Sequence, residues 1–144
     1  ALAAWCEANQ PRGRLPVRIH MAACLLAAAN NSPDALQWAR ARGSPCAGYL
    51  TEGLVREIFS RDASSLPSSV VRVCSAATVA AFHGHWDALR WALEGGGERD
   101  KWTCVGAAAG GQLAVLEHLR AVGCPWDGLS CSGAAGHGHL EVLQ

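Results

Sequence analysis

The cysteines and histidines near the C-terminus are the residues of this chain whose types could do chemistry together. Cys124, Cys131, His137 and His139 follow one another with the spacing Cys-x6-Cys-x5-His-x-His. Zinc sites usually pair their cysteines about two to four residues apart, so this spacing fits a zinc site poorly. A small buried cysteine also behaves as a compact apolar side chain. We therefore expect structural thiols with no metal and no cofactor; a metal site and a disulfide are the alternatives.

Catalysis by histidine is the other chemistry that these residue types suggest. His85 and His139 each follow a glycine in a predicted turn. A catalytic histidine needs a nucleophile or an orienting partner within reach, and nothing in the sequence could pair with His85 that would not also pair in a neighbouring repeat. The glycine run at residues 95–97 lacks the Gly-Lys-Ser/Thr ending and the preceding strand of a phosphate-binding loop. We expect no catalytic residues and no enzyme activity.

These residues recur because the chain repeats itself. Four similar segments begin at Cys24, Ala77, Cys104 and Cys131. The last two intervals between these starts are equal, and the first is about twice as long. The spacing therefore predicts one divergent unit between the first two segments. Repetition at this period is typical of stacked two-helix units, each of which buries its apolar face against its neighbours.

The unit at residues 100–126 predicts how the two helices of a repeat are delimited. Thr103 is expected to cap a short helix over residues 104–109. A glycine pair breaks that helix, and a second helix is expected over residues 113–122, with its apolar side chains mostly on one face. Gly123 is expected to end the second helix in the left-handed conformation.

Leucines and alanines recur at fixed places in the units. The equivalent leucines are Leu36, Leu89, Leu116 and Leu143, and the equivalent alanine pairs lie at residues 27–28, 80–81, 107–108 and 134–135. Small side chains let the first helices lie close to their neighbours, while the leucines fill the space between units. The pattern predicts an all-α fold, a solenoid of stacked antiparallel helix pairs with no sheet.

One block of this pattern resembles a known family. Ala-Ala-x-x-Gly-His stands at residues 80–85 and 134–139, with a near copy at residues 107–112. The block resembles the ankyrin repeat. Three further motifs narrow the resemblance to a short ankyrin-like variant: Thr103-Cys104, Ser130-Cys131 and Gly123-Cys124-Pro125-Trp126. The resemblance covers nearly the whole chain and fits residues 47–73 poorly.

The units differ from the family in length. The ankyrin repeat has about 33 residues, against the 27 that separate Cys104 from Cys131. The missing residues fall in the link between units, where the family carries a projecting hairpin finger, so we expect fingers that are shortened or absent. The resemblance implies binding of a protein partner through the concave helices. It also implies that the histidine after the glycine is structural, with its ring hydrogen-bonded to turn backbone.

The repeats divide the chain as one ankyrin-like solenoid segment over residues 1–144. The expected units are the end of a preceding unit at 1–10, a unit at 17–46, a degenerate unit at 47–73, units at 74–99 and 100–126, and a truncated unit at 127–144. Irregular stretches at residues 10–18 and 61–73 are expected to be loops, either for binding or as tolerated surface excursions. Both ends look cut from a longer array.

Composition limits the partners of the chain. Twelve basic residues balance twelve acidic ones, which argues against a nucleic-acid partner held by bulk charge. No apolar run reaches the length of about 18 residues that a membrane span needs. Seven cysteines with no obvious disulfide framework favour an intracellular, reducing compartment, with the cytoplasm preferred. We expect a non-catalytic scaffold for protein–protein interaction; the alternative is a structural subunit of a large protein or ribonucleoprotein assembly.

Two tryptophans are the best candidates for contact with a protein partner. Trp38 and Trp91 share one repeat position, so we expect them to pack between units. Trp102 and Trp126 are predicted to lie in links instead, beside Lys101 and Asp127. Tryptophan is enriched at binding hot spots. We therefore expect Trp102 and Trp126 to be anchors, with Lys101 and Asp127 as a polar rim; the alternative is that both tryptophans fold back over the next helix pair.

Overall fold

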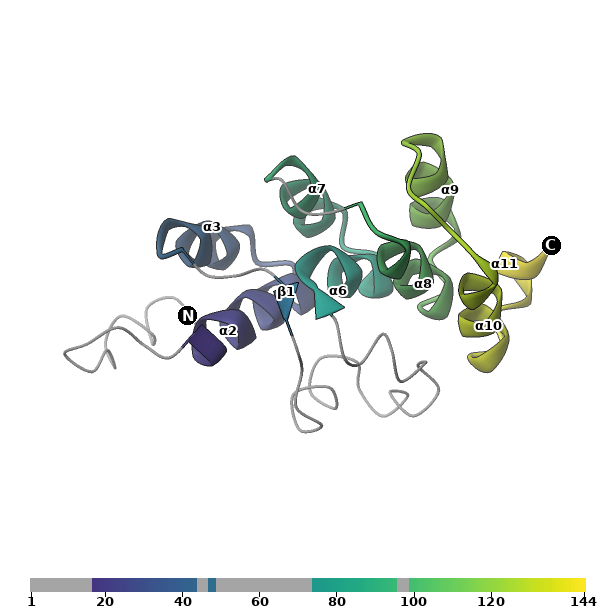
Figure 1. The fold of residues 1–144 in the computed structure, drawn as a ribbon, viewed down its shortest axis with the longest axis horizontal. Coiled ribbons are helices and arrows are strands. Elements are labelled where there is room, and N and C mark those ends of the chain that lie inside the picture. The colour runs from purple at the N-terminus through teal and green to yellow at the C-terminus, as the bar shows by residue number, and fades with distance from the viewer. Residues whose placement is uncertain (1–16, 44–46, 49–73, 96–98) are drawn as a thin grey trace.

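The computed structural model of the chain describes residues 17–43, 47–48, 74–95 and 99–144. Their eight helices are α2 (Val17–Ala29), α3 (Pro33–Ala41), α6 (Ala76–His83), α7 (Trp86–Glu94), α8 (Lys101–Ala109), α9 (Leu113–Ala121), α10 (Gly128–Gly136) and α11 (Leu140–Leu143). The predicted all-α class is confirmed (Figure 1). The expected unit end at residues 1–10 and the irregular stretches lie outside the described residues, except that residues 17–18 begin α2.

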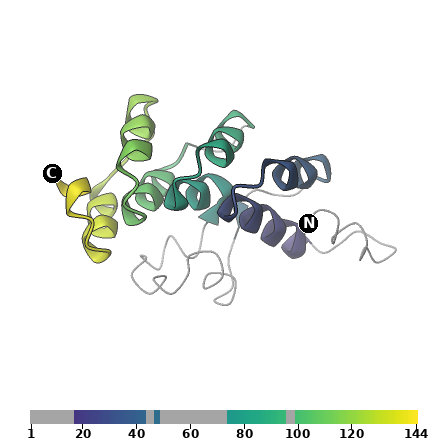
Figure 2. The same ribbon diagram turned by 180° about the vertical axis from the view of Figure 1, so that it is seen from behind.

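The helices lie in two layers. The first helices of the pairs, α2, α6, α8 and α10, form a row in this order, and the second helices α3, α7 and α9 lie along one side of that row (Figures 1 and 2). Each first helix packs against the next first helix and against the second helix of its own pair. The buried side chains, mostly alanine, leucine and valine, form one cluster that runs along the row.

Each helix pair is joined by the same turn. One residue of each turn has a positive φ: Asn31 at 49°, Gly84 at 71°, Gly111 at 67° and Gly138 at 74°. The following residue donates its backbone N–H to the first alanine of the pair expected from the sequence, at 2.9 Å in all four turns: Ser32 to Ala27, His85 to Ala80, Gln112 to Ala107 and His139 to Ala134. This left-handed turn satisfies a carbonyl group at the end of the first helix.

The first helices approach one another so closely that only small residues fit between them. Gly106 of α8 faces Thr78 of α6, and a Cβ on this glycine would lie 2.7 Å from the Thr78 carbonyl oxygen. The alanine pairs are buried as predicted, apart from Ala135 on the last pair. Of the four equivalent leucines, Leu143 is exposed and the other three are buried.

Helix α8 begins earlier than the sequence predicts. Asp100, not Thr103, is its N-cap residue, and its carboxylate accepts hydrogen bonds from the Thr103 backbone N–H and hydroxyl, each at 3.0 Å. The predicted Thr103 cap and start at residue 104 are therefore wrong. Aspartate caps at least as well as threonine, so the helix gains almost a full turn. The predicted end of α9 is confirmed, because Gly123 adopts a φ of 79°.

A small β-ribbon corrects the prediction of a fold with no sheet. Strands β1 (Ala47–Gly48) and β2 (Cys74–Ser75) pair antiparallel, with Ala47 opposite Ser75. The pairing is two residues long on each side and lies beside the helices. The pairing brings Gly48 next to Cys74.

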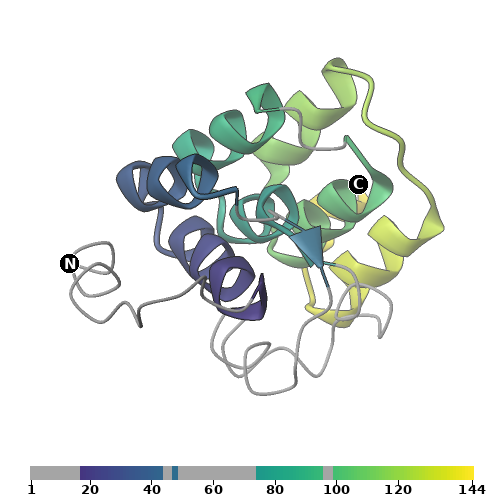
Figure 3. The ribbon, with the colours of Figure 1, turned by 60° about the vertical axis from the view of Figure 1, so that its left-hand side comes forward.

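The first two helix pairs touch each other directly. Helices α2 and α3 pack against α6 and α7, respectively (Figure 3), and the Arg40 side chain donates a hydrogen bond to the Trp91 carbonyl oxygen at 3.0 Å. The degenerate unit expected at residues 47–73 lies outside the described residues beyond Gly48. Direct contact shows that the two flanking pairs are neighbours, and the unit expected at residues 47–73 stays a prediction.

Within the described part of the chain, none of the helices has both the length and the apolar character that crossing a bilayer requires.

Candidate functional site

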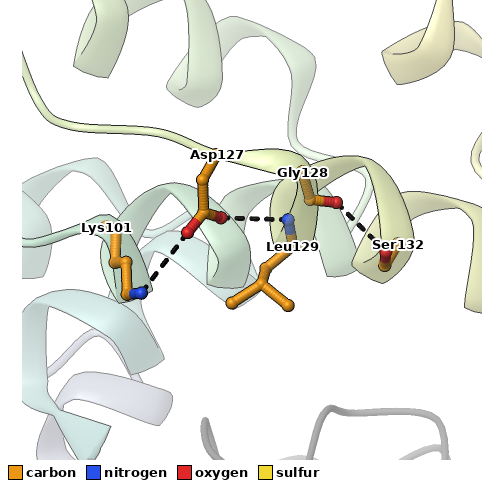
Figure 4. Close-up of polar contacts among 5 residues, drawn as sticks. All are labelled: Lys101, Asp127, Gly128, Leu129 and Ser132. Carbon is orange, nitrogen blue, oxygen red and sulfur yellow. Dashed lines mark hydrogen bonds and ion pairs between the residues drawn. The ribbon is translucent and has the colours of Figure 1, made fainter.

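Lys101 and Asp127 form an ion pair between two consecutive helix pairs. The Lys101 Nζ lies 3.3 Å from the Asp127 Oδ2, and both side chains are exposed. The other carboxylate oxygen of Asp127 accepts the backbone N–H of Leu129 at 2.9 Å, which makes Asp127 the N-cap of α10 (Figure 4). The first turn of α10 is completed by the Ser132 hydroxyl, which donates to the Gly128 carbonyl oxygen at 3.0 Å.

The two charged residues of the predicted polar rim therefore bind each other. An exposed ion pair of this kind contributes about 0–1 kcal/mol to stability, so its main consequence is geometric. Asp127 is fixed by the cap of α10, and Lys101 stands in the first turn of α8. The pair ties the start of one first helix to the start of the next.

Trp102 does not lie in a link as predicted, because the cap at Asp100 places it in the first turn of α8. Its indole is half-buried and packs against the hydrophobic core. The Lys101 ammonium nitrogen lies 4.9 Å from the centre of the ring. Trp102 therefore takes part in packing, and its exposed part lies beside a cation.

Trp126 lies in the link between α9 and α10, as predicted, and is 47% exposed. The Arg120 guanidinium carbon lies 4.5 Å from the centre of its ring. Arg120 stands in the last turn of α9, where the helix dipole favours a cation. Trp126 is thus supported by a cation from the preceding helix and is followed at once by the capping residue Asp127.

Of the two tryptophans that share one repeat position, Trp91 packs between helix pairs as the sequence predicts. Trp38 and Trp91 are both half-buried against the core. The Arg40 guanidinium carbon lies 3.9 Å from the centre of the Trp91 ring, so that Trp91 joins α3 to α7.

The cysteines that the sequence places at one repeat position differ in burial. Cys24 and Cys104 are fully buried, whereas Cys131 on the last first helix is exposed. Burial raises the pKa of the Cys104 thiol to about 12, with further contributions from the charge and hydrogen bond of the neighbouring Cys124. Burial also raises the pKa of Cys124. Both groups are therefore protonated thiols at neutral pH, which makes them poor nucleophiles and poor metal ligands.

The Cys-x6-Cys-x5-His-x-His pattern does not come together in space. Cys124 lies beside Cys104, Cys131 is exposed on α10, and the rings of His137 and His139 stack at 6.1 Å in the last turn. In the described part of the chain, no three histidine, cysteine, aspartate or glutamate side chains are grouped as metal ligands would be.

The turn histidine has a structural hydrogen bond of the type that the family resemblance implies. The His85 Nδ1 lies 3.1 Å from the carbonyl oxygen of Ala28, at the end of α2. The bond therefore crosses to the preceding helix pair. Gln112, at the equivalent position, donates to the Gly110 carbonyl oxygen of its own turn at 3.1 Å.

A groove between α7 and α9 was not predicted from the sequence. It has a volume of about 290 Å³, and its lining includes Leu93 and His118. Counted from the equivalent leucine of each unit, these two residues hold the repeat positions that Arg40 and Trp91 hold in the preceding interface. That substitution of types was the available signal, since a leucine and a histidine stand where the preceding interface has an arginine and a tryptophan.

The comparisons with known proteins return nothing that matches this chain, whether among family models, curated proteins or solved structures. The class of protein that the structure defines is an all-α protein of paired short helices.

Proposed function

We propose that this chain is a segment of an ankyrin-like solenoid that binds a protein partner and catalyses no reaction. Two observations support the solenoid. The first helices contact one another in sequence order, and the same left-handed turn with the same 2.9 Å bond closes all four helix pairs. The link between α9 and α10 contains no strand, in keeping with a shortened hairpin finger.

Trp126 is the observation that carries the binding proposal. It is a large apolar side chain, 47% exposed, in a link between helix pairs. Tryptophan and arginine are the residue types most enriched at binding hot spots, and here the Arg120 guanidinium lies against the Trp126 ring. The ion pair between Lys101 and Asp127, of which Asp127 directly follows Trp126, supplies the polar rim of such a site.

The backbone at Trp126 is held in place before a partner arrives. Asp127 caps α10 with one carboxylate oxygen and binds Lys101 with the other. On the other side, the backbone N–H of Cys124 donates to the Leu119 carbonyl oxygen at 2.9 Å. Ordering a binding residue in advance lowers the entropic cost of association, so Trp126 is better suited than a residue on an unsupported loop.

Affinity capture of the intact protein with mass spectrometry identifies the partner, and two tryptophan variants then test the site. Trp126→Ala should weaken the complex by about 2 kcal/mol or more, the threshold for a hot spot, while the melting temperature stays unchanged. Trp102→Ala should lower the melting temperature because Trp102 packs against the core. If Trp126→Ala lowers the melting temperature and leaves affinity unaltered, the assignment of Trp126 as the anchor is wrong.

A further inference from the structure

The two interfaces between neighbouring second helices, α3–α7 and α7–α9, differ in how the space between the helices is filled. Between α3 and α7, the Arg40 side chain spans the gap. Its guanidinium donates to the Trp91 carbonyl oxygen at 3.0 Å and stacks 3.9 Å from the centre of the Trp91 ring. A Cβ added to Gly95 would collide with this guanidinium, so the arginine fills the space at the end of α7.

The interface between α7 and α9 lacks this closure. At the equivalent repeat positions, Leu93 takes the place of Arg40, His118 the place of Trp91, and Val122 the place of Gly95. A leucine cannot donate to the facing carbonyl group or stack as a cation on a ring. The space that Arg40 fills in the first interface is therefore left as the α7–α9 groove of about 290 Å³.

The interior of the groove is apolar. Leu89, Leu93 and Val122 line it together with Trp86, which is 40% exposed. The Trp86 ring meets His118 edge to face, with 5.3 Å between ring centres. A volume near the lower end of the roughly 300–1,000 Å³ range of ligand pockets suits one or two apolar side chains better than a large cofactor.

Cations stand at the rim of the groove. Arg90 and Arg99 are exposed and line it, and neither guanidinium group has a hydrogen bond or an ion pair with another residue in the described part of the chain. Among the described residues of the lining, Glu94 is the acidic one. A guanidinium group binds a carboxylate through two parallel hydrogen bonds, so the unpaired arginines complement acidic side chains on an occupant.

We propose that the α7–α9 groove binds a protein segment in which an apolar side chain is flanked by acidic residues. The apolar side chain enters the space over Leu93 and Val122, and the flanking carboxylates pair with Arg90 and Arg99. This site is separate from Trp126, which does not line the groove, and it rests on the second-helix layer and not on the links. The two proposals can therefore fail independently.

The test uses short synthetic peptides labelled with fluorescein, with a central Leu, Phe or Trp and a pair of Asp or Glu residues on each side. Fluorescence anisotropy should show binding of the acidic peptides and none of matched peptides with Lys in place of the acids. Arg90→Glu and Arg99→Glu should each weaken binding about tenfold or more, because each substitution removes a charge-assisted hydrogen bond and also places a like charge against the acidic residues of the peptide. Arg42→Glu is the matched control, because it makes the same change of charge at a residue that follows α3 and does not line the groove.

A second variant closes the groove without changing the rim. The triple substitution Leu93→Arg, His118→Trp and Val122→Gly recreates the arginine–tryptophan contact of the preceding interface, together with the glycine that makes room for the guanidinium there. It should abolish peptide binding while the protein remains folded, and Trp126→Ala should leave peptide binding intact. The proposal is overturned if no acidic peptide binds, if basic-flanked peptides bind equally, or if Arg42→Glu weakens binding as much as Arg99→Glu. Unchanged peptide affinity in the folded triple variant overturns it as well.

Discussion

The His85 Nδ1 lies 3.1 Å from the Ala28 carbonyl oxygen, although the two residues are far apart along the chain. The contact joins the turn of one helix pair to the end of the first helix of the preceding pair. The same two helix pairs are joined a second time by the backbone N–H of Ala88 in α7, which donates to the Asn31 side-chain oxygen at 3.3 Å. Neighbouring pairs are therefore fixed at their turns as well as along their helices, and the stability of the array should depend on contacts between pairs.

Gly106→Ala tests how closely the first helices approach. An added Cβ would lie 2.7 Å from the Thr78 carbonyl oxygen and 3.0 Å from its Cγ2, so α6 and α8 must separate. We expect a loss of about 1–3 kcal/mol in the free energy of unfolding, as for other overpacked cores, despite the higher helix propensity of alanine. Chemical denaturation measures it. Gly128→Ala is the control, because a Cβ at Gly128 of α10 meets nothing within 4 Å; equal losses would mean that crowding is not the cause.

Leu116→Ala tests whether damage stays local. Leu116 is buried between the layers, and truncation of a buried leucine costs about 2–5 kcal/mol. In a linear array each unit contacts only its neighbours, so hydrogen exchange should accelerate in α8 to α11 before it does in α2 and α3. Leu113→Ala, at an exposed position of the same helix, should change little. A uniform loss of protection along the described helices would contradict the linear array.

Asp100→Ala tests the start of α8. The substitution removes the acceptor for both the backbone N–H and the buried hydroxyl of Thr103, and loss of an N-cap costs about 0.5–2 kcal/mol. Asp100→Asn should retain most of the stability, since asparagine also caps well. Lys101→Ala removes an exposed ion pair and the cation beside the Trp102 ring, and should cost about 1 kcal/mol. Thermal unfolding ranks the three variants; a larger effect at Lys101 than at Asp100 would show that the ion pair, and not the cap, holds this end of the helix.

The Cys104 thiol should make stability depend on pH. Its pKa in the folded protein is about 12 against an ordinary value of 9.0, so the folded state holds the proton more tightly than the unfolded state. The stabilisation is fully present below pH 9 and is lost as the pH rises from about 9 to about 12. Cys104→Ala should flatten this part of the stability profile, measured by denaturation at several pH values. An identical fall in stability for the variant and the original chain would locate the titration elsewhere.

Local patterns in the sequence were sufficient for the helix pairs. The glycines at residues 84, 111 and 123 ended or joined helices where predicted, and Trp91 packed between units as its repeat position indicated. Helix ends and turns depend on residues within a few positions of each other, so a repeating sequence states them several times. The start of α8 was the exception. Aspartate and threonine are both residue types that cap helices, and only the hydrogen bonds of the folded helix show that Asp100, and not Thr103, is the cap.

Tertiary structure alone decided which helix pairs are neighbours and where space is left between them. The long interval from Cys24 to Ala77 does not say which helix pairs touch, and the contact between His85 and Ala28 shows that the two pairs on either side of it are neighbours. The burial of Trp102 and the opening at Leu93 and His118 likewise arise where separate helices meet. The free energy of such contacts depends on which surfaces face each other, and residues far apart in the chain do not carry that information in their local sequence.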